Sequence, residues 1–382
     1  MWRKEVQASL MRGGTSRGVF LLDEKLPAGN RDELFVKLMG SPDPLQVDGL
    51  GGGFSSTSKV MVVRKGTKSG ADVDYLFGQV YVDKAKVDYS GNCGNLTAAV
   101  GPFAVDEGLV KPPRSDTPHD FDVKLFNINT KKHIISTFKV QDGKTYYSGR
   151  NDVEGVPETG ALVEYRILDP AGTAASSLSS SDAIIEPSLK VDLGAKTVDV
   201  SVVDVSSVYA FVPPEAIGIS GTELPTMINA NENILERAER LRHAIRLKLG
   251  SRLLTGEETE DSPSALRLVV VSEMKSYTDW FGRTINVTDA DVMVRAFSMG
   301  RMHHAVPFTA ALCIAAAAKI PGTIVNRVAR QTEGEEIRIA HPKGIARASA
   351  KVKVVRGKPI VEYVKGRRTA RLLMRGTAYV EG

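Results

Sequence analysis

Two stretches of the sequence decide the fold: SGNCGNLTAAVGPFAVDEGLV (90–110) and MHHAVPFTAALCIAAAAKIPG (302–322). In each, Thr-Ala-Ala opens a helix of small residues that follows a turn and precedes strand-like runs, so that Thr97 superposes on Thr309. Self-similarity of this kind is the sequence signature of a repeated structural unit. We therefore expect two similar α/β domains, each containing one of these helices.

The rest of the chain alternates predicted strands with a few predicted helices. Short valine-rich runs bounded by Gly, Lys or Asp are typical of strands, as at 19–22, 59–63 and 80–87. Helical spacing and capping residues predict the helices, which are expected over 31–38, 96–107, 231–249, 289–298 and 309–319.

A Ser/Ala-rich segment at 171–188 has neither the strand nor the helix period. We place the domain boundary inside this segment. The predicted domains are 1–185 and 186–382, and the terminal strand is able to return to the first domain.

The composition is that of a soluble globular protein. Of 382 residues, 42% are hydrophobic and 25% charged, and no run approaches the roughly 18–20 apolar residues of a membrane span. Two cysteines cannot form a disulfide framework, and the N-terminus lacks the apolar core of a signal peptide. These features predict a cytoplasmic location.

The charge pattern argues against nucleic acid as a partner. The net charge of +5 is small, and the basic residues are spread out except at 356–371, which we interpret as a solvated strand pair. A mild positive balance also suits a small polyanionic substrate. The adjacent His303 and His304 have diverging side chains, so we expect no metal site.

Three segments carry candidate chemistry. The first is MRGGTSRGVFLL (11–22), in which glycines let backbone amides approach an anion and hydroxyls add donors. A simple hairpin turn is the alternative. The second is DGLGGGFSSTSKVMVV (48–63), which is not a phosphate loop because Ser58 stands where that motif needs glycine. There Lys59 opens a strand, and burial would let it act as a base; a surface lysine at a strand end is the alternative.

The third segment is SGNCGN (90–95), directly before the first of the two small-residue helices. A cysteine at a helix N-terminus favours the thiolate, and the free amides of the first turn can bind a carboxylate. Together, Cys93 and these amides suit proton transfer at the carbon next to a carboxylate. A structural cysteine is the alternative, and for Cys313, in the middle of a helix, it is the preferred interpretation.

The ordered blocks MRGGTSRGVF, GSPDP, QVDGLGGGFSSTSKV, DVDYLFGQV, SGNCGNLTAAVGPFA and SMGRMHHA resemble the PrpF-type 2-methylaconitate cis–trans isomerase family. Its relatives include 4-oxalomesaconate tautomerase, 3-methylitaconate Δ-isomerase and aconitate Δ-isomerase. The resemblance implies a diaminopimelate-epimerase-like α/β (α+β) fold, with two similar domains, each a curled sheet around a central helix. It also implies a cofactor-independent isomerase of an aconitate-like unsaturated di- or tricarboxylic acid.

The family's catalytic lysine and cysteine fall on Lys59 and Cys93. Which of them removes the proton stays open, and Ala305 or Val306 near the matching place disfavours a symmetric two-thiol epimerase. A polycarboxylate needs cations and amides from both domains. The residues expected to bind it are Arg12, Gly13, Gly14, Thr15, Ser16, Arg17, Ser56, Ser58, Asn92, Gly94 and Asn95, with Lys275, Ser298, Met299, Gly300, Arg301 and His304.

Two segments depart from the family's pattern, SSLSSSDAIIEP (176–187) and DVSSVYAF (204–211). The alternative function is therefore a non-catalytic or specialised-metabolism homologue that binds a polycarboxylate. We expect a small-molecule substrate, no nucleic acid and no membrane partner, and we leave a homodimer open.

Overall fold

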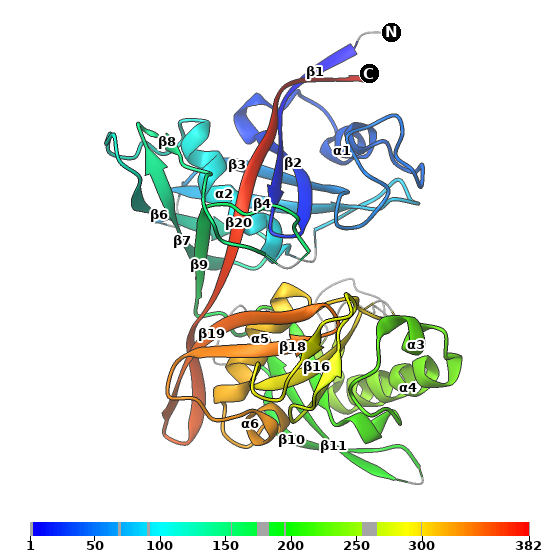
Figure 1. Ribbon diagram of the computed structural model, residues 1–382. Coiled ribbons are helices and arrows are strands. Elements are labelled where there is room, and N and C mark those ends of the chain that lie inside the picture. Colours follow the sequence, from blue (N-terminus) through cyan, green and yellow to red (C-terminus); the bar gives the residue numbers. More distant parts are fainter. Residues whose placement is uncertain are drawn as a thin grey trace. The chain divides into compact units, whose positions relative to one another are not determined.

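The computed structural model describes residues 3–67, 70–89, 92–153, 155–173, 183–194, 196–253, 266–298 and 300–381. The chain divides into two compact units (Figure 1). Unit 1 comprises Met1–Ile167 and Arg367–Gly382, and unit 2 comprises Leu168–Gly366. The chain therefore passes from unit 1 to unit 2 at residues 167–168, before the boundary expected after residue 185. The reason is that the residues after the strand at 162–168 bond to unit 2: Ala171 forms a β-bridge with Val205, and the amide of Gly172 donates to Asp204 O at 3.3 Å.

Unit 1 is a ring of strands. They are β1 (Arg3–Gly13), β2 (Ser16–Leu22), β3 (Lys59–Lys65), β4 (Val73–Val80), β5 (Val87–Asp88), β6 (His119–Asn127), β7 (Lys132–Gln141), β8 (Lys144–Thr145), β9 (Leu162–Leu168) and the end of β20 (Lys358–Glu381). The pairing order β1-β2-β3-β4-β6-β7-β9-β20 returns to β1, so the sheet closes on itself. Helix α2 (Gly94–Asp106) contacts β1, β2, β3, β6 and β7, while α1 (Arg31–Met39) contacts β4 and β5.

Helix α2 is the central helix of unit 1. All but two of its residues, Asn95 and Asp106, are buried, as expected for a helix that is apolar or small on every side. A methyl group at Gly101 would lie 2.7 Å from Phe138 Cε1, so glycine allows the helix to approach β7 closely. The helix ends before Gly108, whose φ of 77° lies in the left-handed region that favours glycine.

Unit 2 is a curled sheet around a second buried helix. Its strands are β10 (Ile185–Asp192), β11 (Thr197–Asp204), β12 (Val208–Val212), β13 (Arg267–Ser272), β14 (Tyr277–Thr278), β15 (Thr284–Ile285), β16 (Val292–Ser298), β17 (Arg301–Met302), β18 (Glu336–His341), β19 (Gly344–Val355) and the start of β20. Its helices are α3 (Pro225–Asn229), α4 (Glu232–Leu249), α5 (Phe308–Lys319) and α6 (Ile324–Val328). Helix α5 contacts β11, β18 and β19, which lie toward opposite ends of the sheet.

The two units repeat one topology. In unit 1 the successive pairings β1–β2, β2–β3, β3–β4, β4–β6, β6–β7 and β7–β9 are antiparallel, parallel, antiparallel, parallel, antiparallel and antiparallel. Unit 2 has the same series for β11–β12, β12–β13, β13–β16, β16–β18, β18–β19 and β19–β20. Helices α2 and α5 occupy the same place in the series. The expected fold of two similar α/β units, each with a central helix, is confirmed.

The threonines aligned in the sequence have similar surroundings. In unit 1, Thr97 Oγ1 lies 3.1 Å from the hydroxyl of Tyr75, and in unit 2, Thr309 Oγ1 lies 2.8 Å from the hydroxyl of Tyr209. Tyr209 belongs to one of the segments that depart from the family's pattern. It is fully buried, so its bulk fills the core of unit 2. Most of the other departing segment, residues 176–182 of 176–187, lies outside the described residues.

Two predicted elements were wrong. The helix predicted over 289–298 is strand β16, which runs between β13 and β18. Because β16 is buried on both faces, its apolar residues do not alternate, and such a run cannot be told from a helix by periodicity. The strand predicted over 80–87 is a turn between β4 and β5, in which Val80 pairs with Val87.

Candidate active site

The Gly-rich segment 11–22 forms the β1–β2 hairpin, and its turn lies against the start of α2. Gly13 pairs with Ser16, so the turn contains only Gly14 and Thr15. A methyl group at Gly13 would lie 2.3 Å from Asn95 O, so the strand touches the helix backbone here. Thr15 Oγ1 accepts a hydrogen bond of 3.0 Å from Asn95 Nδ2. The hairpin and the start of α2 therefore form one surface.

Cys93 is the N-cap residue of α2 and is 9% exposed. Its thiol donates to Ser16 Oγ across 3.7 Å. The first helical hydrogen bond runs from Thr97 N to Cys93 O (3.0 Å), so the preceding amides, Gly94 and Asn95 among them, have no intrahelical acceptor. Asn92 is also nearby, because its side chain accepts from Thr97 Oγ1 at 3.4 Å. The thiol thus lies beside free amides at the positive end of a helix dipole.

Lys59 begins β3, on the face of the sheet that α2 covers. A methyl group at Gly18 would meet both Leu96 of α2 (2.7 Å) and Lys59 Cβ (3.3 Å). The side chain of Lys59 is 8% exposed, and its ammonium donates to Gln79 Oε1. Burial lowers the pKa of Lys59, and the electrostatic interaction with Cys93 opposes this decrease. The lysine and the cysteine are therefore electrostatically coupled, and burial favours the neutral amine.

Three residues that the sequence interpretation missed complete this cluster. Gln79 binds Lys59, and Tyr165 donates to Gly94 O at 2.7 Å. Arg368, on β20, donates through Nε to Asn95 Oδ1 at 3.0 Å. Burial lowers the pKa of Arg368 to about 10. Its position in the basic segment 356–371 gave no sign that it would lie near Cys93.

Other residues predicted in the first domain lie elsewhere. Arg12 and Arg17 are cross-strand neighbours on the face of the hairpin that points away from α2, because Gly13 and Gly18 face the helix. Arg12 Nη1 donates to Gly14 O and to Thr369 O, each at 3.0 Å. Ser58 is fully buried and donates to Val80 O at 2.9 Å.

One predicted residue of the first domain, Ser56, contacts β2 through its backbone. The carbonyl of Ser56 accepts a hydrogen bond of 3.0 Å from the amide of Arg17. Loop 48–58 is thereby attached to the start of β2, next to the strand that Lys59 begins.

Of the residues predicted in the second domain, Ser298, Gly300, Arg301 and His304 lie shortly before α5, as Gln79 and Asn92 precede α2, whereas Lys275 follows β13. Ser298 and Arg301 pair in the β16–β17 hairpin, whose turn includes Gly300 with a φ of 73°. Met299 lies outside the described residues. His304 is exposed and its ring lies 5.5 Å from that of Trp280, while the exposed Lys275 donates to Ser220 O at 3.1 Å. The repeat therefore gives Ser298 and Arg301 in unit 2 a topological position similar to that of Gln79 and Asn92 in unit 1.

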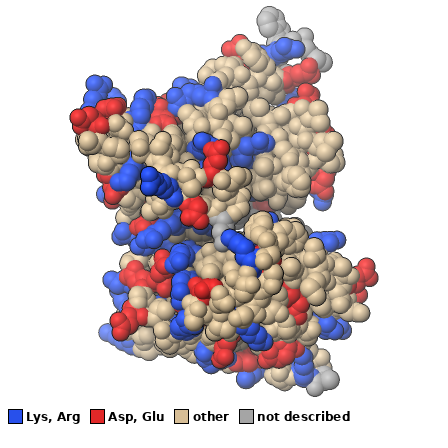
Figure 2. All heavy atoms as spheres, viewed as in Figure 1, with Lys and Arg blue, Asp and Glu red and all other residues tan. Residues whose placement is uncertain are grey.

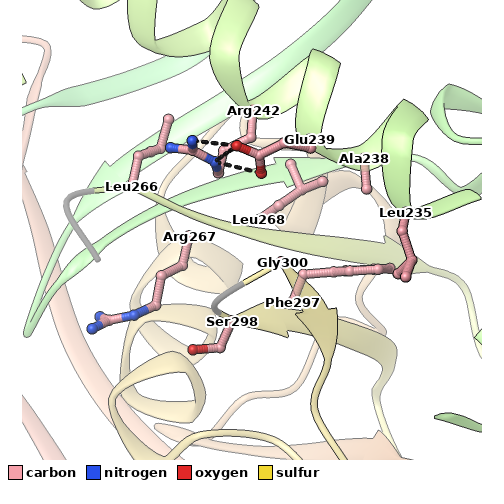
Figure 3. Close-up of a pocket in the computed structure, with 10 residues that line it drawn as sticks. All are labelled: Leu235, Ala238, Glu239, Arg242, Leu266, Arg267, Leu268, Phe297, Ser298 and Gly300. Carbon is pink, nitrogen blue, oxygen red and sulfur yellow. Dashed lines mark hydrogen bonds and ion pairs between the residues drawn. The ribbon is translucent and has the colours of Figure 1, made fainter. Parts of the chain in front are cut away.

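A pocket in unit 2 adjoins this hairpin (Figure 3). Ser298 and Gly300 line it together with apolar side chains such as Phe297. At one side, Arg242 Nε donates to both carboxylate oxygens of Glu239, at 3.0 and 2.9 Å. This arginine is therefore already paired with a carboxylate on its own helix.

Charges are mixed on the surface. On the face shown in Figure 2, Lys and Arg lie among Asp and Glu in each unit. The basic segment 356–371 is part of β20, where Arg367 and Arg371 pair with Glu164 and Glu158. Over the part of the chain that the structure describes, no three His, Cys, Asp or Glu residues cluster as metal ligands. No helix within the same residues has the length and apolarity to cross a membrane.

The fold is that of the diaminopimelate-epimerase-like enzymes. A hydroxyproline epimerase from Agrobacterium vitis aligns over 99% of this chain and 93% of its own, with a TM-score of 0.54 and 11% identity. A solved methylitaconate-delta-isomerase is much more similar, with a TM-score of 0.85 and 36% identity over 99% of this chain and 96% of its own. The chain belongs to the family described as PrpF protein, which it matches over residues 3–381.

Curated relatives agree with this assignment. The 3-methylitaconate isomerase of Eubacterium barkeri is 39% identical, over 97% of this chain and 96% of the relative. The 2-methyl-aconitate isomerase of Shewanella oneidensis is 37% identical, with the same coverage. The 4-oxalomesaconate tautomerase of Pseudomonas putida is 33% identical, over 100% of this chain and 97% of the relative. The protein is an enzyme, an isomerase.

Proposed function

We propose that this enzyme isomerises unsaturated di- or tricarboxylic acids of the methylaconitate and methylitaconate type, with Lys59 and Cys93 as the acid and base. The relatives named for such substrates support the substrate class, since they match nearly the whole chain. The observation that carries the chemistry is the coupling of a buried lysine to a cysteine at a helix N-terminus. The reaction changes no oxidation state, so the proposal includes no cofactor.

The first step is removal of a proton from the carbon next to the double bond. A neutral Lys59 amine, or the Cys93 thiolate, takes this proton, and the C–H electron pair spreads over the adjacent double bond and carboxylate. The lowered pKa of Lys59 shifts its titration toward the neutral amine relative to an exposed lysine. The second step returns a proton to another carbon of the allylic system, or to the same carbon after bond rotation. The result is an isomer with all atoms retained.

The intermediate carries extra negative charge on a carboxylate. The free amides at the start of α2 point to this charge, and such preorganised donors stabilise a transition state more than a ground state. Arg368 adds a cation beside Asn95.

The test is turnover in deuterated water with four acids: 2-methylaconitate, 3-methylitaconate, cis-aconitate and oxalomesaconate. We expect at least one acid to isomerise and to acquire carbon-bound deuterium. Thermal unfolding with each acid is measured in parallel, because binding alone raises stability by mass action. Stabilisation without turnover would replace the proposal with the non-catalytic, polycarboxylate-binding alternative. If no acid causes stabilisation or turnover, both the isomerase proposal and the polycarboxylate-binding alternative are contradicted.

A further inference from the structure

We propose that Gln79 is a positioning residue that holds Lys59 through an uncharged acceptor and so keeps it available as a base. This inference rests on the proposed role of Lys59. Gln79 lies directly opposite Lys59 in the β3–β4 register, with Lys59 on the first residue of its strand. The two side chains therefore point to the same face of the sheet, the face that α2 covers.

The hydrogen bonds of Gln79 determine which end of its amide faces the lysine. Its Nε2 group donates to Ser58 O at 2.8 Å, with longer contacts to Ser55 O (3.2 Å) and Val80 O (3.3 Å). An amide NH₂ group that donates to these carbonyls leaves Oε1 as the acceptor for Lys59. Because an ammonium can only donate, this is the favourable orientation.

The acceptor carries no charge, and this matters for a base. A carboxylate in the same place would stabilise the ammonium and keep the lysine protonated. An amide accepts a hydrogen bond from either protonation state without a net charge of its own. The lysine is thus held in place, while burial continues to favour the neutral amine.

The other groups that face Lys59 do not replace the Gln79 amide as its uncharged hydrogen-bond acceptor. From α2, Cys93 is the group that acts electrostatically on the lysine, and it raises the lysine pKa. From β4, the ring of Phe77 lies 5.2 Å from the ammonium, and from β2 the facing residue is Gly18, which has no side chain. Asp88 of β5 lies opposite Gln79 on the side away from β3. The amide therefore separates Lys59 from the carboxylate of Asp88 along this row of the sheet.

The experiment replaces the amide by a carboxylate and by an apolar side chain. Gln79→Glu adds the charge that the native residue lacks, and Gln79→Met removes the acceptor without adding charge. Gln7→Glu makes the same chemical change on the exposed part of β1 and serves as the control. The Lys59 amine is titrated directly by ¹³Cε NMR, with Lys59→Arg assigning the signal, and the pH dependence of kcat is measured for each protein.

We expect Gln79→Glu to raise the apparent pKa of Lys59 by about 1–3 units, as for an opposite charge at close range. Activity at neutral pH then falls by roughly tenfold per unit and recovers at higher pH. Gln79→Met lowers kcat at every pH without such recovery, and Gln7→Glu matches the wild type. An unchanged Lys59 titration in Gln79→Glu overturns the inference.

The NMR titration needs no substrate, so the two proposals can fail separately. If Lys59→Ala remains fully active while Gln79→Glu shifts the titration, the catalytic role of the lysine is wrong and the pairing is right. If Lys59→Ala is inactive while the titration does not move, only the role of Gln79 is wrong.

Discussion

Replacing Lys59 by methionine should abolish turnover and stabilise unit 1. Methionine keeps a similar length and apolar stem but removes an ammonium that lies in a site only 8% exposed and has a neutral acceptor. Burying this charge costs free energy, which the electrostatic interaction with Cys93 offsets only in part, and the lowered pKa of Lys59 records the net cost. Substitutions that relieve such a functional strain commonly add about 0.5–2 kcal/mol to the free energy of unfolding.

The predicted difference in the free energy of unfolding depends on pH, and the direction of this dependence follows from the lowered pKa of Lys59. The folded protein binds the Lys59 proton less tightly than the unfolded chain, whose lysine keeps its ordinary pKa of 10.5. The wild type therefore gains stability as pH rises from the lowered pKa toward 10.5, because the unfolded state then binds more protons than the folded one. The methionine variant has no Lys59 proton to bind. Its free energy of unfolding therefore exceeds that of the wild type most at low pH, and the difference shrinks as pH approaches 10.5.

The assay is urea denaturation of both proteins at several pH values, with Lys65→Met as the control. Lys65 lies at the exposed end of the same strand and donates to Leu109 O at 2.9 Å. Its replacement should change the free energy of unfolding by less than about 0.5 kcal/mol. The reasoning is refuted if Lys59→Met lowers the free energy of unfolding by more than about 1 kcal/mol, as loss of a buried contact would, and if this decrease does not depend on pH.

Further substitutions test the site. Cys93→Ser should lower kcat by roughly 10²–10⁴ with circular dichroism unchanged, and full activity in Cys93→Ala would remove the thiol from the chemistry. Gly13→Ala places a methyl group 2.3 Å from Asn95 O; it should cost about 1–3 kcal/mol in urea denaturation and lower kcat, and a neutral result would contradict the close packing. Lys275→Met and Arg301→Met should each raise KM about tenfold through loss of a charge-assisted contact, whereas unchanged kinetic constants would exclude that residue from the site.

The central helices and their repeat could be predicted from the sequence because their signals are local. Small residues next to a turn with a candidate cysteine are visible in 90–110 without any knowledge of the sheet. The same local logic failed at β16. There the neighbouring strands bury both faces, and the resulting apolar run is compatible with a helix.

The candidate site could be predicted from the sequence only where a single segment carries its residues. Cys93 and Lys59 stand in glycine-rich contexts that point to chemistry by themselves. Gln79 and Arg368 gain their roles from strand pairing, since Gln79 meets Lys59 across β3–β4 and β20 brings Arg368 back to α2. Arg12 looked like an anion ligand, yet strand alternation turns it to the face away from Cys93.

The central claim is proton transfer by Lys59 and Cys93 within an isomerase site. Its most direct test follows solvent deuterium into 3-methylitaconate or 2-methylaconitate by NMR, with wild type, Lys59→Ala and Cys93→Ala compared at equal concentration. The account predicts carbon-bound deuterium in the wild-type reaction and none with Lys59→Ala, with Cys93→Ala strongly slowed. Deuterium incorporation at the wild-type rate in both variants would contradict it.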